Sequence, residues 1–153
     1  MTLDIVDGLV QEDSIRISWK KGHESQFYWQ ADVPADFSQM EQDGGALVME
    51  FMINKYPKGS VTQRMDCGWP CRGEIDVTEF YKSIPLRQRS KVGISLSCFK
   101  RMGVDMEKIT SPLVLVSKDE FEITFSDVRV IANASEDNTI QLCASEVATL
   151  LQD

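Results

Sequence analysis

Long apolar segments are missing from this chain of 153 residues. No apolar run reaches the roughly 20 residues that a helix needs to cross a bilayer, which argues against a membrane-spanning helix. The first ten residues also lack the basic start and the apolar stretch of a secretory signal. We therefore expect that, if the protein is exported, its signal lies outside this chain.

Basic side chains are in the minority. There are 16 Lys and Arg residues against 24 Asp and Glu residues, which gives a net charge of −8. Binding to phosphate backbones or to anionic lipid surfaces needs clustered cations. The charge balance therefore disfavours nucleic acid and membranes as partners.

Catalytic signatures are equally scarce. His23 is the only histidine and follows Lys20-Lys21-Gly22, which indicates a surface loop rather than a Ser-His-Asp or Cys-His arrangement. No phosphate-binding glycine loop, dinucleotide fingerprint or nucleophile elbow occurs. Carboxylates are too abundant to single out a pair for glycoside hydrolysis. The sequence thus predicts no catalysis by this chain alone and no cofactor.

What the sequence does contain is alternation of apolar and polar residues with a period of two. This alternation predicts half-buried strands at 14–19, 92–98 and 120–125, with Cys98 facing the core. Apolar runs with less alternation, at 46–53, 113–116 and 128–132, are typical of central strands.

Helix signals are weak by comparison. Short helical turns are predicted at 78–82, at 105–109, and at 146–151 with Ser145 as N-cap. Many short strands separated by Gly and Pro turns predict an all-β, antiparallel β-sandwich of the jelly-roll type. We expect one domain over 1–153, with its core at 13–132 and a polar linker or tail at 133–153.

Of the four cysteines, Cys67 and Cys71 are the informative pair. The intervening Gly68-Trp69-Pro70 bends the chain enough to bring the two thiols within bonding distance, which predicts a Cys67–Cys71 disulfide. Because the loop is very short, the bridge is expected to contribute rigidity more than stability. A pair of reduced, partly buried thiols is the alternative.

The other two cysteines give less information. Cys98 is interpreted as a free buried thiol, and Cys143 is too isolated to assign. One histidine and no second closely spaced cysteine pair disfavour a structural zinc site.

Aromatic residues are the remaining candidates for a site. The ring of Trp69 sits in the constrained loop, where it cannot easily reach the core, and such a ring can stack on a sugar or anchor a protein interface. Arg72 can hold sugar hydroxyls or a partner carboxylate beside it, or can simply pair with Glu74 and pack the loop. Trp29 is a further candidate; by alternation Tyr28 faces away from Trp29 and Phe27.

One run in the sequence is distinctive. It is RMDCGWPCRGEIDVT at 64–78, followed in order by ISLSCF at 94–99, GVD at 103–105 and FSDVR at 125–129. Together these segments resemble the extra C-terminal domain of family-three exo-1,3/1,4-β-glucanases of marine proteobacteria, the type called ExoP. The resemblance covers 15–131.

The resemblance implies a sandwich similar to carbohydrate-binding modules, attached to the catalytic domains of a secreted or periplasmic bacterial glucan hydrolase. The catalytic residues of that hydrolase belong to domains absent from this chain. Trp69 stands where a tyrosine is common in similar sequences, so a ring is kept. Asp127 looks like a calcium-ligand position of some carbohydrate-binding sandwiches, but one carboxylate does not define a metal site.

Two functions from different classes follow. The first is a non-catalytic accessory domain that docks on the catalytic domains of the parent hydrolase and supports interdomain or quaternary structure. The second is an independent carbohydrate-binding module that holds β-glucan with Trp69 and Arg72. Sugar-binding sandwiches usually display several coplanar exposed rings, and the sequence nominates one, which favours the first function.

Overall fold

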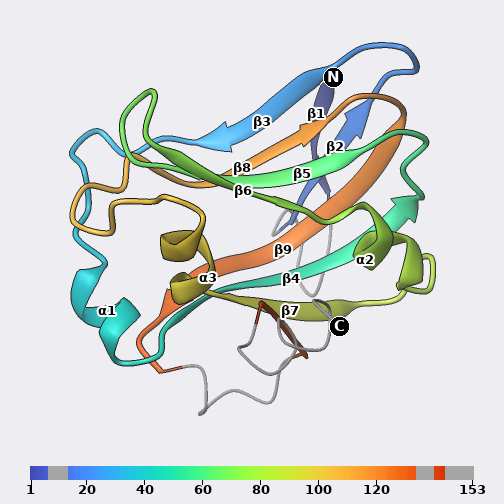
Figure 1. Ribbon diagram of the computed structural model, residues 1–153. Coiled ribbons are helices and arrows are strands. Elements are labelled where there is room, and N and C mark those ends of the chain that lie inside the picture. Colours follow the sequence, from blue (N-terminus) through green and yellow to red (C-terminus); the bar gives the residue numbers. More distant parts are fainter. Residues whose placement is uncertain (7–13, 134–139, 144–153) are drawn as a thin grey trace, which may run out of the picture.

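The computed structural model describes residues 1–6, 14–133 and 140–143, and these form two stacked β-sheets with three short helices (Figure 1). In chain order the elements are β1 (Thr2–Val6), β2 (Ser14–Trp19), β3 (Ser25–Trp29), α1 (Ser38–Gln42), β4 (Ala46–Lys55), β5 (Val61–Asp66), β6 (Arg72–Asp76), α2 (Thr78–Ser83), β7 (Ser90–Ser95), α3 (Leu96–Arg101), β8 (Ser111–Ser117), β9 (Phe121–Ile131) and β10 (Ile140–Leu142). Among the described helices, none has the length and apolar character to span a bilayer.

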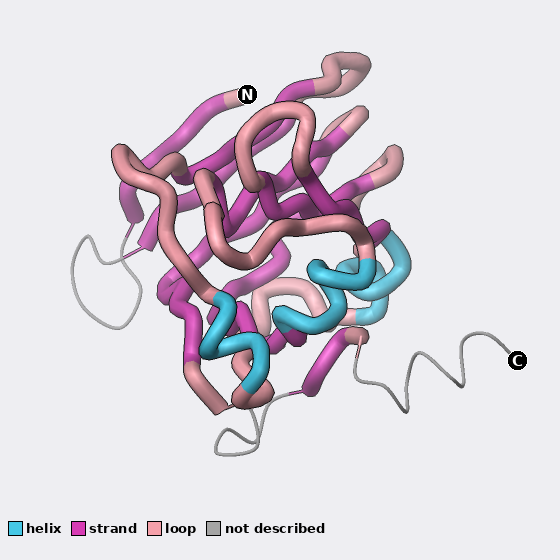
Figure 2. Tube along the Cα trace, turned by 60° about the vertical axis from the view of Figure 1, so that its left-hand side comes forward, coloured by secondary structure: helices cyan, strands magenta, loops and turns pink. Residues whose placement is uncertain are grey.

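The larger sheet has six strands in the order β1-β2-β9-β4-β7-β10, and the smaller has four in the order β3-β8-β5-β6. Neighbouring strands are antiparallel throughout, except that β10 runs parallel to β7. Figure 2 shows the strands as the body of the molecule and all three helices on one side of it. The predicted all-β antiparallel sandwich with few short helices is confirmed.

The core lies between the two sheets and follows the predicted strand periodicity. Ile17 and Trp19 of β2, and Phe121 and Ile123 of β9, all face it and are almost fully buried. The central strand β4 is buried on both faces, because Leu47 and Met49 join the main core while Ala46 and Val48 pack in a second cluster on the other side. This is the arrangement expected of the weakly alternating runs.

Of the predicted helical turns, one is confirmed and one is wrong. The 78–82 turn is α2. The 105–109 segment is not helical, because Ile109 exchanges backbone hydrogen bonds with Ala35 at 2.7 and 2.8 Å and so forms an isolated bridge instead. Only a turn remains before it, closed by Lys108 N to Asp105 O at 3.3 Å. The turn predicted at 146–151 lies outside the described residues.

The interpretation of Cys98 as a free thiol at the end of a strand is wrong. β7 ends at Ser95, and Cys98 lies on α3, where it is buried but bonded to Cys143. Leu96 of α3 is buried too, as strand alternation predicts, but so is Phe99, which a strand would turn to the opposite face. The partner could not be found locally: β10 pairs Leu142 with Ile94 of β7, and this pairing brings Cys143 to α3.

Candidate functional site

The candidate site begins at the turn between β5 and β6, which the predicted disulfide closes. The structure contains the Cys67–Cys71 bridge, with Cα atoms 5.0 Å apart. Inside the loop Cys67 N donates to Cys71 O at 2.9 Å, and Cys71 N donates to Gly68 O at 2.8 Å. Gly68 has φ +87°, a conformation that a residue with a Cβ rarely adopts. The loop is therefore fixed by covalent, hydrogen-bonding and conformational constraints together.

Trp69 projects from this loop into solvent, with 75% of its surface exposed. The Arg72 guanidinium carbon lies 4.4 Å from the centre of its ring, and Arg72 Nε lies 3.0 Å from Glu74 Oε1. Of the two uses that the sequence offered for Arg72, the structure contains the pairing with Glu74, and the binding of a sugar or of a partner carboxylate stays a prediction. Surface ion pairs are weak, but here the pair holds the cation against the ring and so orients Trp69.

Beside Trp69 lies a groove of about 460 Å³ on the outer face of the four-stranded sheet. Its lining comes from β3 (Gln26, Tyr28) and the nearby Gln30, from β5 (Arg64, Asp66), from the disulfide loop (Gly68, Trp69), and from Ser111 at the start of β8 with Thr110 before it. Two of these residues, Tyr28 and Trp69, are aromatic and exposed. Tyr28 keeps 48% of its surface exposed. Most of the others carry amide, hydroxyl, carboxylate or guanidinium groups.

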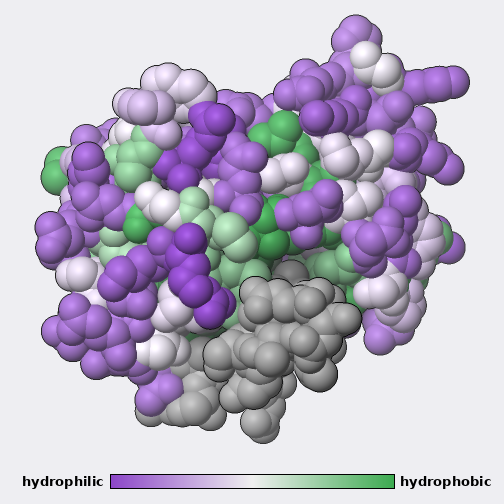
Figure 3. All heavy atoms as spheres, viewed as in Figure 1, coloured by the Kyte–Doolittle hydropathy of each residue, from purple (hydrophilic) through white to green (hydrophobic). Residues whose placement is uncertain are grey.

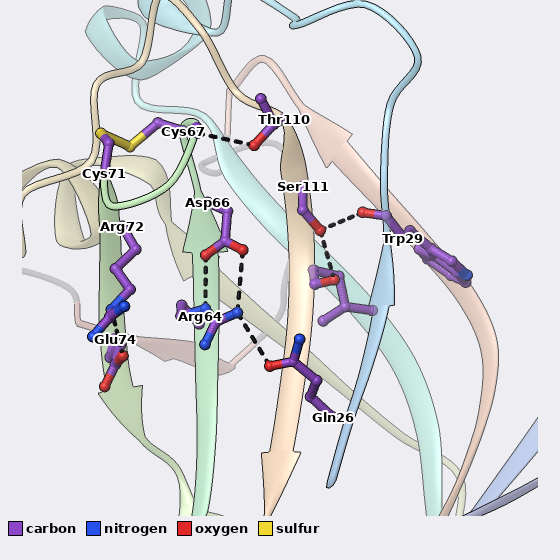
Figure 4. Close-up of polar contacts among 12 residues, drawn as sticks. Gln26, Trp29, Arg64, Asp66, Cys67, Cys71, Arg72, Glu74, Thr110 and Ser111 are labelled. Atoms are coloured by element: carbon purple, nitrogen blue, oxygen red, sulfur yellow. Dashed lines mark hydrogen bonds and ion pairs between the residues drawn. A yellow bond between two sulfur atoms is a disulfide. The ribbon is translucent and has the colours of Figure 1, made fainter.

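The polar floor of the groove is a connected network (Figure 4). Arg64 makes a two-pronged ion pair with Asp66, from Nε to Oδ1 at 2.7 Å and from Nη2 to Oδ2 at 3.2 Å. Its Nη2 also donates to Gln26 Oε1 at 3.3 Å. Strand pairing produces this arrangement, since β8 lies between β3 and β5 and both Tyr28 and Arg64 pair with Val114. The Thr110 hydroxyl accepts from Gly68 N at 3.1 Å and ties the disulfide loop to the same edge.

The structure does not bring Trp29 to this groove. Its ring is half-buried, meets Phe27 edge-on at 5.7 Å between centroids, and packs against the core. Figure 4 shows the Trp29 ring turned away from Arg64 and Gln26. The ring that does reach the groove is Tyr28, which sequence reasoning placed on the opposite face from Trp29 without nominating it.

The remaining candidates lie elsewhere. Asp127 forms an ion pair with Arg129, which also lies 3.6 Å from Glu50 across the sheet. Over the described part of the chain, no three His, Cys, Asp or Glu side chains converge as a metal site would require. His23 is exposed in the β2–β3 turn.

Comparison with solved structures gives several matches at low sequence identity. The extra C-terminal domain of the exo-1,3/1,4-β-glucanase ExoP from a Pseudoalteromonas species is 18% identical, with a TM-score of 0.73 over 93% of this chain and 76% of that one. The whole ExoP structure is 20% identical, with a TM-score of 0.75 over 92% of this chain. This chain spans 16% of the length of that glucanase.

A third structure is the family 30 carbohydrate-binding module of the cellulosomal cellulase Cel9D-Cel44B of Clostridium thermocellum. It is 19% identical, with a TM-score of 0.66 over 90% of this chain and 84% of that one. At these identities the matches show a shared sandwich fold. None of the curated proteins matches the chain.

A family model adds a match at the level of sequence. The family is Exop_C, described as galactose-binding domain-like, and its model matches residues 1–130. This confirms the resemblance carried by the cysteine loop and the later strand motifs. Because the match spans well over half of the sequence, the chain belongs to the Exop_C family of galactose-binding domain-like domains.

Proposed function

We propose that this domain binds β-glucan in the groove between Tyr28 and Trp69, as an accessory domain of a glycoside hydrolase. The observation that carries the proposal is that two exposed aromatic rings, from elements far apart in the sequence, line one polar groove. The preference for docking over sugar binding was based on a single exposed ring. Tyr28 supplies a second exposed ring, and the preference therefore moves to sugar binding.

The chemistry of the groove suits a neutral polysaccharide. A pyranose ring offers an apolar face of C–H groups, which stacks on an aromatic ring, and a rim of hydroxyls, which hydrogen-bond to amides and charged groups. Gln26, Gln30 and the Arg64–Asp66 pair present both donors and acceptors for such a rim. The groove is also open along one sheet face, as a chain of sugars requires.

The parent protein is proposed to be a secreted or periplasmic family-three exo-1,3/1,4-β-glucanase. Support comes from the similarity to a domain of ExoP, which is itself a fraction of a larger glucanase. The two disulfides, Cys67–Cys71 and Cys98–Cys143, fit an oxidising compartment. On this proposal the domain itself hydrolyses nothing, so release of glucose by the purified domain would contradict it.

Affinity electrophoresis of the domain in gels containing laminarin or mixed-linkage β-glucan tests the groove. The domain should be retarded, and Trp69→Ala and Tyr28→Ala should each weaken binding by about tenfold or more, as truncation of an aromatic anchor does. Val33→Ala is the matched control, because Val33 is also 75% exposed but lies outside the groove. Retardation that survives the double variant Tyr28→Ala/Trp69→Ala would refute the groove.

Docking on the catalytic domains is the second candidate function, and the two are compatible. It is favoured by the position of the similar domain within a multidomain glucanase, of which this chain spans 16%. If the domain docks on the catalytic domains, its deletion from the parent enzyme should lower the melting temperature of those domains. If the domain only binds glucan, its deletion should leave that melting temperature unchanged.

A further inference from the structure

Cations gather at one end of the sandwich, although the chain as a whole is acidic. The loops at this end, with the last residue of β4 and helix α2, hold eight of the 16 Lys and Arg residues, all of them exposed. We call this surface the basic end; it consists of Lys20, Lys21, Lys55, Lys58, Lys82, Arg87, Arg89 and Lys118. The net charge of −8 concealed this cluster, because its members come from four separate parts of the sequence.

Hydrogen bonds join the four loops into one surface. Gly22 N donates to Asp119 Oδ1 at 3.0 Å, which links the β2–β3 turn to the β8–β9 turn. The β8–β9 turn meets the β4–β5 loop through Lys118 N to Ser60 O at 3.1 Å and Lys58 N to Glu120 O at 2.9 Å.

The β4–β5 loop and the end of β4 in turn contact the α2–β7 connection. Tyr56 OH donates to Ile84 O at 2.7 Å, and Arg87 N donates to Ile53 O at 2.8 Å. The surface is therefore continuous from the β2–β3 turn to the start of β7. These loops lie at the right of Figure 1, and Figure 3 shows hydrophilic residues covering much of that side.

The acidic groups nearby offset only part of the charge of this surface, because Asp119 lies near Lys21 and Glu79 near Lys82. Asp119 accepts from the backbone N–H groups of Glu120 and Gly22, and these hydrogen bonds lower its pKa. Glu79 lies 3.8 Å from Lys82. Within the part of the chain that the structure describes, neither Arg87 nor Arg89 forms an ion pair. Two guanidinium groups are thus left for an outside partner.

Arg87 adds a second, independent observation. Its φ is +57°, the left-handed region that glycine and asparagine occupy with less strain than arginine does. Local stability alone therefore favours another residue here. An exposed arginine held in a strained conformation is a feature that occurs where a side chain is used for binding.

We infer that the basic end docks on an acidic protein surface, which deepens the docking candidate above by naming the surface and the charge of its partner. A protein is favoured over a polysaccharide because the exposed aromatic rings of the described residues, Tyr28 and Trp69, line the groove and not this end, where the exposed apolar side chains are the aliphatic Met1 and Leu3 beside the β2–β3 turn. The Trp69 loop lies at the opposite end of β5 from Val61, so the groove remains open while the basic end is occupied. Complementary charge of this kind raises association rates and selects partners.

Fluorescence anisotropy with a labelled oligoglutamate peptide tests the charge preference, using the whole chain. The unaltered protein should bind at low ionic strength and less at physiological salt. Arg89→Glu should weaken binding by about fivefold or more. Lys108→Glu is the matched control, because it makes the same change in net charge at the opposite end of the sandwich. Within the described part of the chain Lys108 forms no ion pair. Lys108→Glu should weaken peptide binding by less than about half as much as Arg89→Glu does.

Arg87→Asn separates a binding role from a structural one. Asparagine tolerates the left-handed conformation, so the melting temperature should stay the same or rise while peptide binding weakens. A fall in melting temperature with unchanged binding would overturn the assignment of Arg87 to the surface.

Three other outcomes would overturn the inference as a whole. They are no binding of the peptide, equal weakening by Arg89→Glu and Lys108→Glu, and tighter binding of heparin than of oligoglutamate, which would assign the surface to an anionic polysaccharide. Arg89→Glu should leave retardation by laminarin intact. A failure of groove binding would instead appear as lost retardation in every variant, so the two proposals fail separately.

Discussion

The layer between the two sheets and the outer face of the four-stranded sheet are built from the same strands, but they hold different chemistry. Along β5, Met65 faces the core and is fully buried, whereas Arg64 and Asp66 on either side of it face the groove. On β3, Phe27 packs inward and Tyr28 outward. Because the inner face carries most of the packing, we expect the loss of rings and ion pairs on the outer face to leave the fold intact.

The largest expected effect comes from the inner face. Leu115 of β8 is fully buried opposite Phe27 and Gln63, and Leu115→Ala should lower the free energy of unfolding by about 2–5 kcal/mol. Val116→Ala, at the half-buried next position on the outer face, is the control and should lower it by about 1 kcal/mol or less. Urea denaturation measures both. Equal decreases in the free energy of unfolding for the two variants would contradict the assignment of most of the packing to the inner face.

A smaller effect, and on binding rather than folding, is expected in the groove. Arg64→Lys keeps the charge but removes the two-pronged contact with Asp66, so affinity for β-glucan should fall about five- to tenfold, or about 1 kcal/mol, with little change in stability. Arg16→Lys, on the larger sheet beside Asp4, is the matched control. Calorimetry with laminarin provides the measurement, and unchanged affinity of the Arg64 variant would remove that network from the site.

The smallest effect at neutral pH is expected for Tyr81. Its ring is fully buried against Phe51 and Phe121, and its hydroxyl has no hydrogen-bond partner among the described residues. Tyr81→Phe should therefore change the free energy of unfolding by no more than about 1 kcal/mol, in either direction.

The same residue predicts a pH dependence. Burial raises the pKa of Tyr81, so above the unfolded-state value of about 10 the unfolded chain loses the proton while the folded chain keeps it. Stability is then unaffected below about pH 9 and falls by up to about 1.4 kcal/mol per pH unit above pH 10. Tyr81→Phe should remove this alkaline loss, and Tyr28→Phe should retain it. An identical alkaline profile for all three proteins would contradict the role assigned to burial.

Much of the fold could be predicted because strand alternation is a local property. The pattern in 14–19 and 120–125 depends only on which residues must be buried, and the structure places strands there. The same pattern misled at Cys98, because a helical turn buries Leu96 and Cys98 as a strand would. The disulfide loop was predictable for a similar reason, since its two cysteines and its turn residues are adjacent.

The sequence by itself determined the all-β sandwich, the bridged Cys67–Cys71 turn and the exposure of Trp69. Only the tertiary structure decided that Tyr28 joins Trp69 in one groove, that Cys143 bonds to Cys98, and that eight cations form one surface. The physical reason is that each of these depends on strand pairing between residues far apart in the chain. Local periodicity fixes which face a side chain takes but not which strand lies beside it.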